Sequence, residues 1–329
     1  MTVRERMQAI LNMKKVDKVP AVEWATWWDK TVAKWQEENS SVPSDKFELF
    51  DFFGLDTQYQ LWVPSRDETT PAPAYEGAPI MEDEKDYENL LSHLYPENTF
   101  ENIKASLLQI KQQHDEGKIA VWFTLEGFFW FPRTLFGIEN HLYSFYDYPE
   151  LMKRINTDLI EFHKKVIEAI YEVLTPEFMT FAEDMSYNHG PMISKDLFDE
   201  FMAPFYKEIV PLIKAKGTKV FIDTDGDVEP LIPWFKEVGI EGVLPLERQA
   251  GVDVNRIRQN HPDWLMMGGF DKTIMKNGEE AMRKEFERLL PAIKSGGYIP
   301  SVDHQTPPDV SVENYRIYVK LLREYCEKI

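Results

Sequence analysis

The sequence has little cysteine and no long apolar segment, and both absences narrow its class. Among 329 residues there is one cysteine, Cys326, so no disulfide can form within the chain and a reducing compartment is the natural one. No apolar run approaches the ~20 residues that a membrane-spanning helix needs. The first residues, which include Arg4 and Arg6, lack the pattern of a secretory signal. We therefore expect a cytoplasmic protein that does not enter a membrane.

Basic residues are also in the minority. The chain has 37 Lys and Arg against 56 Asp and Glu, a net charge of −19, which argues against nucleic-acid binding because that needs a clustered basic surface. The ordinary reading of the charge is solubility. The hydrophobic content of 43% is enough for one large core, and the nine tryptophans are the informative excess.

Eight short runs rich in β-branched or aromatic residues alternate with longer stretches of helical period. This alternation is typical of β/α units, and eight is the number of strands in a closed parallel barrel. We therefore predict a single α/β domain over residues 1–329, a (β/α)8 TIM barrel. The runs are Val19–Trp24, Thr57–Val63, Ile119–Glu126, Phe178–Asp184, Lys219–Asp225, Gly242–Glu247, Leu265–Asp271 and Tyr298–His304.

Three features outside the strands can be predicted. Thr2 and Glu5 have the spacing of a capping box, which predicts an N-terminal helical extension that closes one end of the barrel. Residues 64–118 form the longest connection and are predicted to be an insertion after the second strand with at least one helix. The apolar helix that follows the fourth strand contains Pro204 and Pro211, which should bend or split it.

Most of the predicted strands end in acidic residues. Active sites of such barrels lie at the carboxyl ends of the strands, so these side chains are placed for chemistry. Any single Asp there could instead be a helix N-cap, whereas Glu is not a favoured cap. A ring of carboxylates is self-repulsive unless a metal or a cationic ligand is present. The residues are Glu23, Glu126, Glu183, Asp184, Asp223, Asp225, Glu247, Asp271, Asp303 and His304.

Several segments resemble the uroporphyrinogen decarboxylase superfamily, and they keep its order along nearly the whole chain. They are Thr2–Arg6, Val16–Pro20, Gly190–Ser194, Phe201–Pro204, Asp223–Asp227, Leu231–Pro233, Pro245–Glu247, Gly268–Asp271 and Pro300–Pro308. The decarboxylases resemble one another in an arginine-containing stretch after the first strand, which holds the carboxylates of a tetrapyrrole. Here that stretch, Glu23–Trp28, has no arginine and several aromatic rings. The resemblance is therefore closer to the corrinoid-dependent methyltransferase branch, in particular to the methyltransferase components of O-demethylases.

In the coenzyme M branch of these methyltransferases, a His-x-Cys pair after the fifth strand and a late Cys hold zinc. The pair falls here on Asp223 and Asp225, and the late Cys on Asp303 or His304, so no thiolate remains. What survives is an oxygen and imidazole set of Asp223, Asp225 and His304, with Glu247 nearby. Zinc accepts such ligands, and we predict a zinc site. The alternative is that these acids bind substrate or brace loops.

Aromatic residues gather after the first three strands. The run Phe128–Phe131 cannot face one way, so some of its rings should line a pocket while others are core. We expect Trp24, Trp62, Phe129 and Trp130 in substrate binding. Two polar residues carry open alternatives. Arg133 anchors a substrate carboxylate or makes a surface salt bridge, and His189 faces the mouth of the barrel or is structural.

The resemblance implies a methyltransferase that moves a methyl group from a small methylated compound to the cobalt of a separate corrinoid protein, whose cobalamin the partner carries. An aryl methyl ether suits the aromatic residues best, with Glu126 or Glu183 as general acid or a metal as Lewis acid. The opposite direction of transfer stays open. Alternatives are a decarboxylase of a small carboxylic acid or another uroporphyrinogen-decarboxylase-like enzyme, and a non-catalytic barrel. A homodimer is one expected assembly.

Overall fold

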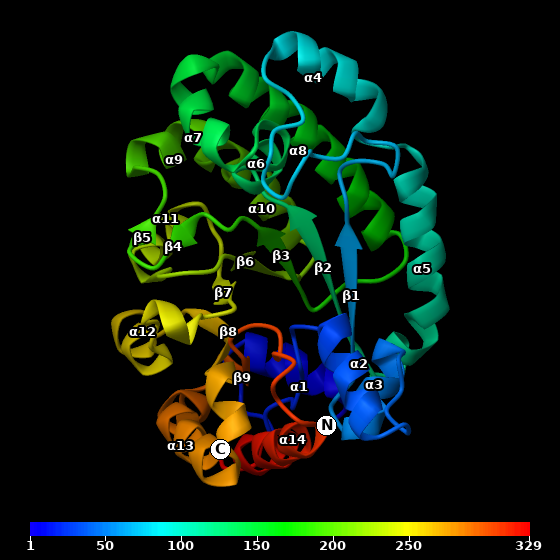
Figure 1. The fold of residues 1–329 in the computed structure, drawn as a ribbon, viewed down its shortest axis with the longest axis vertical. Coiled ribbons are helices and arrows are strands. Elements are labelled where there is room, and N and C mark those ends of the chain that lie inside the picture. The colour runs from blue at the N-terminus through cyan, green and yellow to red at the C-terminus, as the bar shows by residue number, and fades with distance from the viewer.

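The computed structural model describes residues 1–329, and its centre is a curved sheet of seven parallel strands (Figure 1). Seven of the eight predicted strands are confirmed. β2 and β8 are buried along their whole length, which explains why their sequences are continuously apolar rather than alternating. The strands, in their order across the sheet, are β1 (Gln58–Val63), β2 (Ala120–Glu126), β3 (Phe178–Ala182), β6 (Lys219–Asp223), β7 (Gly242–Leu244), β8 (Leu265–Phe270) and β9 (Tyr298–Val302).

The eighth predicted strand, Val19–Trp24, is wrong as a strand. The segment is irregular, and it connects to its neighbours mainly through side chains. On one side the backbone N–H of Trp24 donates to Ser301 Oγ, and on the other Gln58 Nε2 donates to the carbonyl of Glu23. Pro20 has no N–H to contribute to a ladder. The segment nevertheless fills the place between β9 and β1, so the fold is a TIM-type α/β barrel whose seam lacks a regular ladder.

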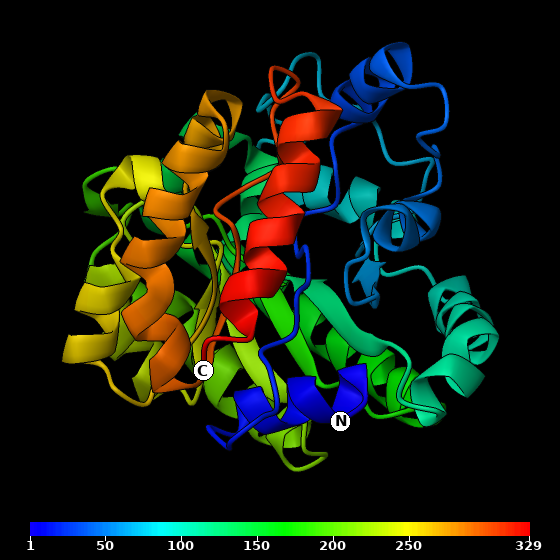
Figure 2. The same cartoon turned by 90° about the horizontal axis from the view of Figure 1, so that it is seen from below.

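The N-terminal helix α1 (Val3–Leu11) has the predicted capping box. The Thr2 hydroxyl accepts from the Glu5 N–H, and the Glu5 carboxylate accepts from the Thr2 N–H. Figure 2 shows α1 lying across one end of the barrel, with α14 (Val312–Cys326) and the segment after α1 running side by side up the wall. Arg4 and Gln8 of α1 reach Glu177, which directly precedes β3. The helix therefore covers the amino ends of the strands, as predicted.

The other helices surround the sheet. The predicted split after the fourth strand is confirmed, because Met202 separates α9 (Lys195–Phe201) from α10 (Ala203–Lys214), whereas Pro211 lies within α10. The insertion 64–118 contains α4 (Glu84–Leu90) and α5 (Asn98–Asp115). No helix combines the length and the apolarity that crossing a membrane requires. The remaining helices are α2 (Asp29–Glu38), α3 (Lys46–Phe53), α6 (Trp130–Phe136), α7 (Ile138–Asp147), α8 (Pro149–Tyr171), α11 (Ile232–Glu237), α12 (Val254–Asn260) and α13 (Glu279–Ser295).

Candidate active site

A pocket of about 350 Å³ opens at the carboxyl ends of the strands, and we call it the mouth pocket. Six of the twelve residues predicted for the site line it, from the seam, β1, the β2–α6 turn, β6 and the segment after β9. No lysine or arginine is among its lining residues. They are Trp24, Ala25, Thr26, Gln60, Trp62, Trp130, Ala182, Asp184, Asp223, Asp225, His304 and Gln305.

Three carboxyl groups share this pocket and repel one another. Burial, reinforced by the charges of Asp184 and Asp225, raises the pKa of Asp223 well above its usual value. Burial, then Asp184 and Glu247, raises the pKa of Asp225 to about 7. Burial also raises the pKa of Asp184, which has φ +44°, a conformation unusual for a non-glycine residue. The pKa of Asp225 therefore lies near neutral pH, where ordinary Asp side chains are ionised.

Asp184 is a residue to which sequence reasoning gave no role. The sequence places Glu183 and Asp184 together at the end of the fourth predicted strand and predicts only Glu183 as a general acid. The structure turns the neighbours apart, so that Asp184 lines the mouth pocket and Glu183 is fully buried beneath it. The sequence contains one signal for this difference, because adjacent residues of a strand point to opposite faces of the sheet.

The four predicted metal ligands do not form a metal site. His304 Nε2 lies 3.8 Å from Asp225 Oδ2, and Glu247 accepts a hydrogen bond from the Gly226 N–H at 3.1 Å instead. No group of three or more His, Cys, Asp or Glu is arranged to hold a metal ion, whereas zinc needs three protein ligands about 2.0–2.2 Å from one point. These residues as arranged do not fit zinc, which stays a prediction from the sequence, and no chemical step below uses it.

Three indole rings line the mouth pocket from three separate elements. Trp24 is nearly buried, its Nε1–H donates to the carbonyl of Val302 at 2.7 Å, and its ring meets His304 edge-on at 6.4 Å. Trp62 at the end of β1 is 47% exposed. Trp130 begins α6 and carries the Arg133 guanidinium over its face at 5.2 Å. The aromatic wall predicted from the sequence is therefore present.

Phe129 is a correction. It is completely buried, its ring lies edge-on to His141 at 4.6 Å, and it stacks with Phe145 at 6.3 Å. Phe128 and Phe131 are also fully buried. The β2–α6 turn directs these three rings into the core and only Trp130 into the pocket, so Phe129 does not contact substrate.

Neither predicted general acid lines the pocket. The Glu183 carboxylate accepts from the backbone N–H groups of Phe128, Phe129 and Trp130 at 2.8–2.9 Å and from the Tyr206 hydroxyl. A Cβ at Gly127 would collide with this carboxylate. Burial raises the pKa of Glu183 to about 8, while the three N–H groups oppose that rise. Glu183 therefore acts as a brace that holds the β2–α6 turn.

Glu126, at the end of β2, is also occupied. Its carboxylate accepts from the Ser65 N–H at 2.8 Å and lies 3.9 Å from an Arg66 nitrogen. Burial raises the pKa of Glu126, and the Arg66 charge opposes the rise. The geometry gives it contacts with the insertion after β1, not with the mouth pocket.

Two other predicted residues lie outside the pocket lining. Arg133 donates to the carbonyl of Asp184 at 3.0 Å, which supports the Asp184 backbone from behind. His189 is exposed on the hairpin of β4 (Ser186–Tyr187) and β5 (Gly190–Pro191), edge-on to Tyr187 at 5.7 Å. Neither position is that of a substrate anchor.

The remaining acids at the strand ends brace loops. Asp271 accepts from the Thr273 N–H as a helix N-cap. Asp303 accepts from the N–H groups of Arg248 and Lys272 at 3.0 and 3.1 Å. Glu23 accepts from the hydroxyls of Ser301 and Tyr315 at 2.7 and 2.9 Å. These three acids are fixed by donors of the protein itself.

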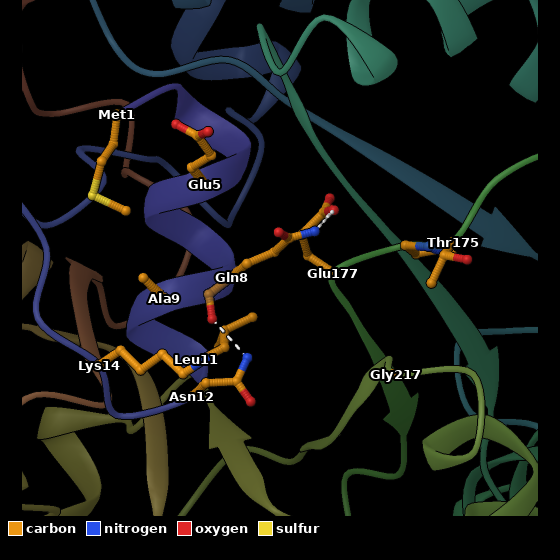
Figure 3. Close-up of a pocket in the computed structure, with 11 residues that line it drawn as sticks. Met1, Glu5, Gln8, Ala9, Leu11, Asn12, Lys14, Thr175, Glu177 and Gly217 are labelled. Atoms are coloured by element: carbon orange, nitrogen blue, oxygen red, sulfur yellow. Dashed lines mark hydrogen bonds between the residues drawn. The ribbon is translucent and has the colours of Figure 1, made fainter.

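A second cavity lies at the opposite end of the barrel, and we call it the basal pocket (Figure 3). It has a volume of about 470 Å³ and lies between α1 and the segments that precede β3 and β6. Although it is larger than the mouth pocket, it lies at the end of a TIM barrel where residues serve stability rather than catalysis. We therefore place the candidate active site in the mouth pocket.

A pocket with a polar lining at the carboxyl ends of the strands lies where TIM-barrel enzymes have their active sites. Comparison with known protein families identifies the family of this chain. Residues 75–325 match the model of the uroporphyrinogen decarboxylase (URO-D) family, so the chain belongs to that family. The superfamily predicted from the sequence is confirmed.

Individual relatives are distant. A uroporphyrinogen decarboxylase of Pelodictyon phaeoclathratiforme is 23% identical over 139 residues, covering 40% of this chain and 38% of that protein. One of Hydrogenobaculum sp. is 22% identical over 177 residues, covering 50% and 48%. These alignments span less than half of the relatives' length. A putative vitamin-B12 independent methionine synthase structure from Listeria monocytogenes gives a TM-score of 0.48 at 10% identity, over 94% of this chain and 98% of that one. Activity and substrate do not follow from such matches.

Proposed function

We propose that this protein is a methyltransferase that moves a methyl group from a small methylated compound to the cobalt of a separate corrinoid protein. The observation that carries the proposal is the lining of the mouth pocket, which combines three indoles with three carboxyls and contains no lysine or arginine. A tetrapyrrole with many carboxylates would meet repulsion here instead of the guanidinium forks that bind such groups. The volume of about 350 Å³ is suited to a small molecule.

The mouth pocket has no cysteine or serine that could serve as a nucleophile. The single cysteine of the chain, Cys326, is fully buried in α14, where burial raises the pKa of the thiol far above its usual value. His304, the one histidine in the lining, lies 3.8 Å from Asp225, and burial lowers its pKa. A nucleophile supplied by a partner, such as reduced cobalt, is compatible with this lack.

For an aryl methyl ether, the donor expected from the sequence, the leaving oxygen needs a proton or a Lewis acid. Glu126 and Glu183 do not line the pocket, so the best-placed proton donor is Asp225. The pKa of about 7 means that this carboxyl is partly protonated at neutral pH. The indoles of Trp24 and Trp62 would hold the aromatic ring.

The second candidate is decarboxylation of a small carboxylic acid, which the family name favours. Its carboxylate would have to approach Asp223 and Asp225, whose charges repel it. The lining is therefore less suited to an acid than to a neutral or cationic molecule. A non-catalytic barrel is the remaining alternative.

One assay separates the three. The protein is mixed with chemically reduced cobalamin and, in turn, with aryl methyl ethers, methylated amines and quaternary ammonium compounds, and methylcobalamin is followed by its absorbance. We expect one class of donor to give methylcobalamin and the demethylated product. Release of carbon dioxide from uroporphyrinogen or a small acid, without methyl transfer, would establish the decarboxylase. Neither reaction would favour the non-catalytic barrel.

A further inference from the structure

We propose that the methyl donor is a quaternary ammonium ion held between the indoles and the carboxylates of the mouth pocket. The word donor rests on the function proposed above, whereas binding of the cation does not. The carboxyl groups of the pocket, its indole rings and the chemistry of the leaving group all favour this ligand class.

The first observation is a set of three carboxyl groups that share the pocket with no lysine or arginine. Asp184, Asp223 and Asp225 all line the pocket, and no hydrogen bond or ion pair within the chain reaches the Asp223 carboxylate. Elsewhere in the molecule buried acids have donors, as Asp303 and Glu183 do. A carboxylate that is left without a partner in a pocket is ready to receive one from a ligand.

Two cationic side chains lie nearby, and both are already engaged. The Lys272 ammonium is 3.5 Å from Asp303 and donates to Gln249 at 3.2 Å. The Arg133 guanidinium donates to the carbonyl of Asp184 and covers one face of Trp130. Glu247 adds a further negative charge beside Asp225. Neither cation is therefore free to neutralise the pocket, and its carboxyl groups, where ionised, attract a cationic ligand.

The second observation is the aromatic wall. The electron-rich face of an indole attracts cations, and quaternary ammonium groups are the ligands that aromatic cages recognise. Trp24 is held in place by its Nε1 hydrogen bond, while Trp62 is free at the rim, 47% exposed. The guanidinium over Trp130 shows that a ring of this wall already accepts a cation on one face. Carboxylates alone would favour a metal ion, and rings alone a neutral ligand. Together they favour an organic cation.

The third argument is the chemistry of the leaving group. In a quaternary ammonium donor the C–N bond breaks with its electron pair on nitrogen, and a neutral tertiary amine leaves. The methyl carbon receives the electron pair of the reduced cobalt, so the step needs no proton and no added redox agent. An aryl ether instead expels an oxygen anion, which needs an acid or a metal. An ether would depend on a protonated Asp225 for this acid, because no metal-binding group is formed, whereas the ammonium donor needs neither acid nor metal.

Binding is tested by calorimetric titration with choline and with 3,3-dimethylbutan-1-ol, which has the same shape without the charge. We expect choline to bind with one site per chain and at least about tenfold more tightly than the neutral alcohol. Equal affinities, or no choline binding at all, would overturn the proposal.

Two tryptophan variants form a matched pair. Trp62 and Trp28 are 47% and 44% exposed, but only Trp62 lines the mouth pocket. Trp62→Ala should weaken choline binding by roughly 5- to 30-fold, and Trp28→Ala should leave it unchanged. Similar losses in both variants would contradict a role of the pocket wall. Circular dichroism and the melting temperature confirm that both variants fold.

Turnover then separates this inference from the proposed function. With reduced cobalamin, choline or a related quaternary ammonium ion should yield methylcobalamin and the corresponding tertiary amine, which for choline is N,N-dimethylaminoethanol. If only aryl ethers yield methylcobalamin, the methyltransferase stands and the cationic donor is wrong. If choline binds but no compound transfers a methyl group, the pocket is a cation site and the methyltransferase proposal fails.

Discussion

The two ends of this barrel differ in how their carboxylates are bound: Glu177 at the basal end is buried among donors, and Asp223 at the mouth is only partly buried. At the basal end, the Glu177 side chain is completely buried and accepts from Arg4 Nε at 2.7 Å, Gln8 Nε2 at 3.2 Å and the Val121 N–H at 2.8 Å, with His114 Nε2 at 3.1 Å. At the mouth, Asp223 has no partner within the chain. The Glu177 carboxylate thus binds α1 to the barrel at the basal end, whereas the Asp223 carboxylate at the mouth has no partner in the chain. Satisfied acids indicate structure, and unsatisfied ones indicate a place for a ligand.

The largest expected effect comes from removing the basal acid. Glu177→Ala should lower the free energy of unfolding by about 3–5 kcal/mol, because a part-buried arginine, a buried histidine and a backbone N–H would all lose their partner. Denaturant titration measures the loss. Glu5→Ala is the control, since Glu5 lines the same basal pocket but only completes the exposed capping box, worth about 1 kcal/mol. A smaller loss for Glu177→Ala than for Glu5→Ala would refute the structural role of this end.

The next effect concerns Glu183, which lies near the mouth yet has the full set of donors typical of the basal end. Glu183→Gln should cost about 2–3 kcal/mol, because an amide nitrogen would face backbone N–H groups where an oxygen now accepts from them. Thermal unfolding checks this. Glu126→Gln, with one backbone donor and a distant arginine, should cost less. If Glu183→Gln kept its stability and lost methyl transfer, the catalytic role expected from the sequence would be upheld.

At the mouth, replacing an acid should increase the stability of the fold instead of lowering it. The folded pKa of Asp225, about 7, lies above the ordinary value of 3.8, so the folded state binds this proton more tightly and the wild type loses stability as pH rises through that interval. Asp225→Asn removes the loss. Its stabilisation should be absent below about pH 4 and complete above about pH 7. Because the side chain is 39% exposed, screening limits the gain to about 1 kcal/mol.

Melting temperatures at pH 5 and pH 8 measure this difference, and a gain that is independent of pH would contradict it. Choline affinity should also fall as pH drops below about 7, since protonation removes the charge that attracts the cation. The charged groups that act on Asp225 are Asp184, Glu247, Asp303 and Lys272.

The smallest expected effect is that of metal removal. Because Asp223, Asp225, Glu247 and His304 form no ligand group, we expect the purified protein to contain well under one zinc per chain and a chelator to leave its melting temperature unchanged. Elemental analysis decides. One zinc per chain that disappears in His304→Ala would restore the zinc site predicted from the sequence.

The barrel could be predicted because most of its strands are short apolar runs, buried along their whole length, that alternate with helical stretches. The seam could not, since Val19–Trp24 has a similar composition but finds its partners in Ser301 and Gln58, which are far away in the sequence. Backbone pairing depends on register, and a single sequence does not contain register.

Six of the twelve predicted site residues line the mouth pocket, and the other six do not for a related reason. Acids at strand ends were recognised, but which of them meet donors depends on turns, as Glu183 and Asp184 show with opposite fates at adjacent positions. In the run Phe128–Phe131, the β2–α6 turn selects Trp130 for the pocket and buries the other three rings. Composition predicts that such residues gather at the mouth, and local backbone geometry decides which face inward.

The irregular seam between β9 and β1 has a kinetic consequence. A ladder of backbone bonds opens cooperatively, whereas isolated side-chain bonds break one at a time, so amide hydrogens along this line should exchange with solvent sooner than those of β2 and β3. Trp24 is the last residue of the irregular segment Val19–Trp24, and it is held there by hydrogen bonds to Ser301 and Val302. One wall of the mouth pocket therefore belongs to the segment whose amide hydrogens we expect to exchange soonest. A ligand that stacks on the Trp24 ring should slow amide exchange along this segment.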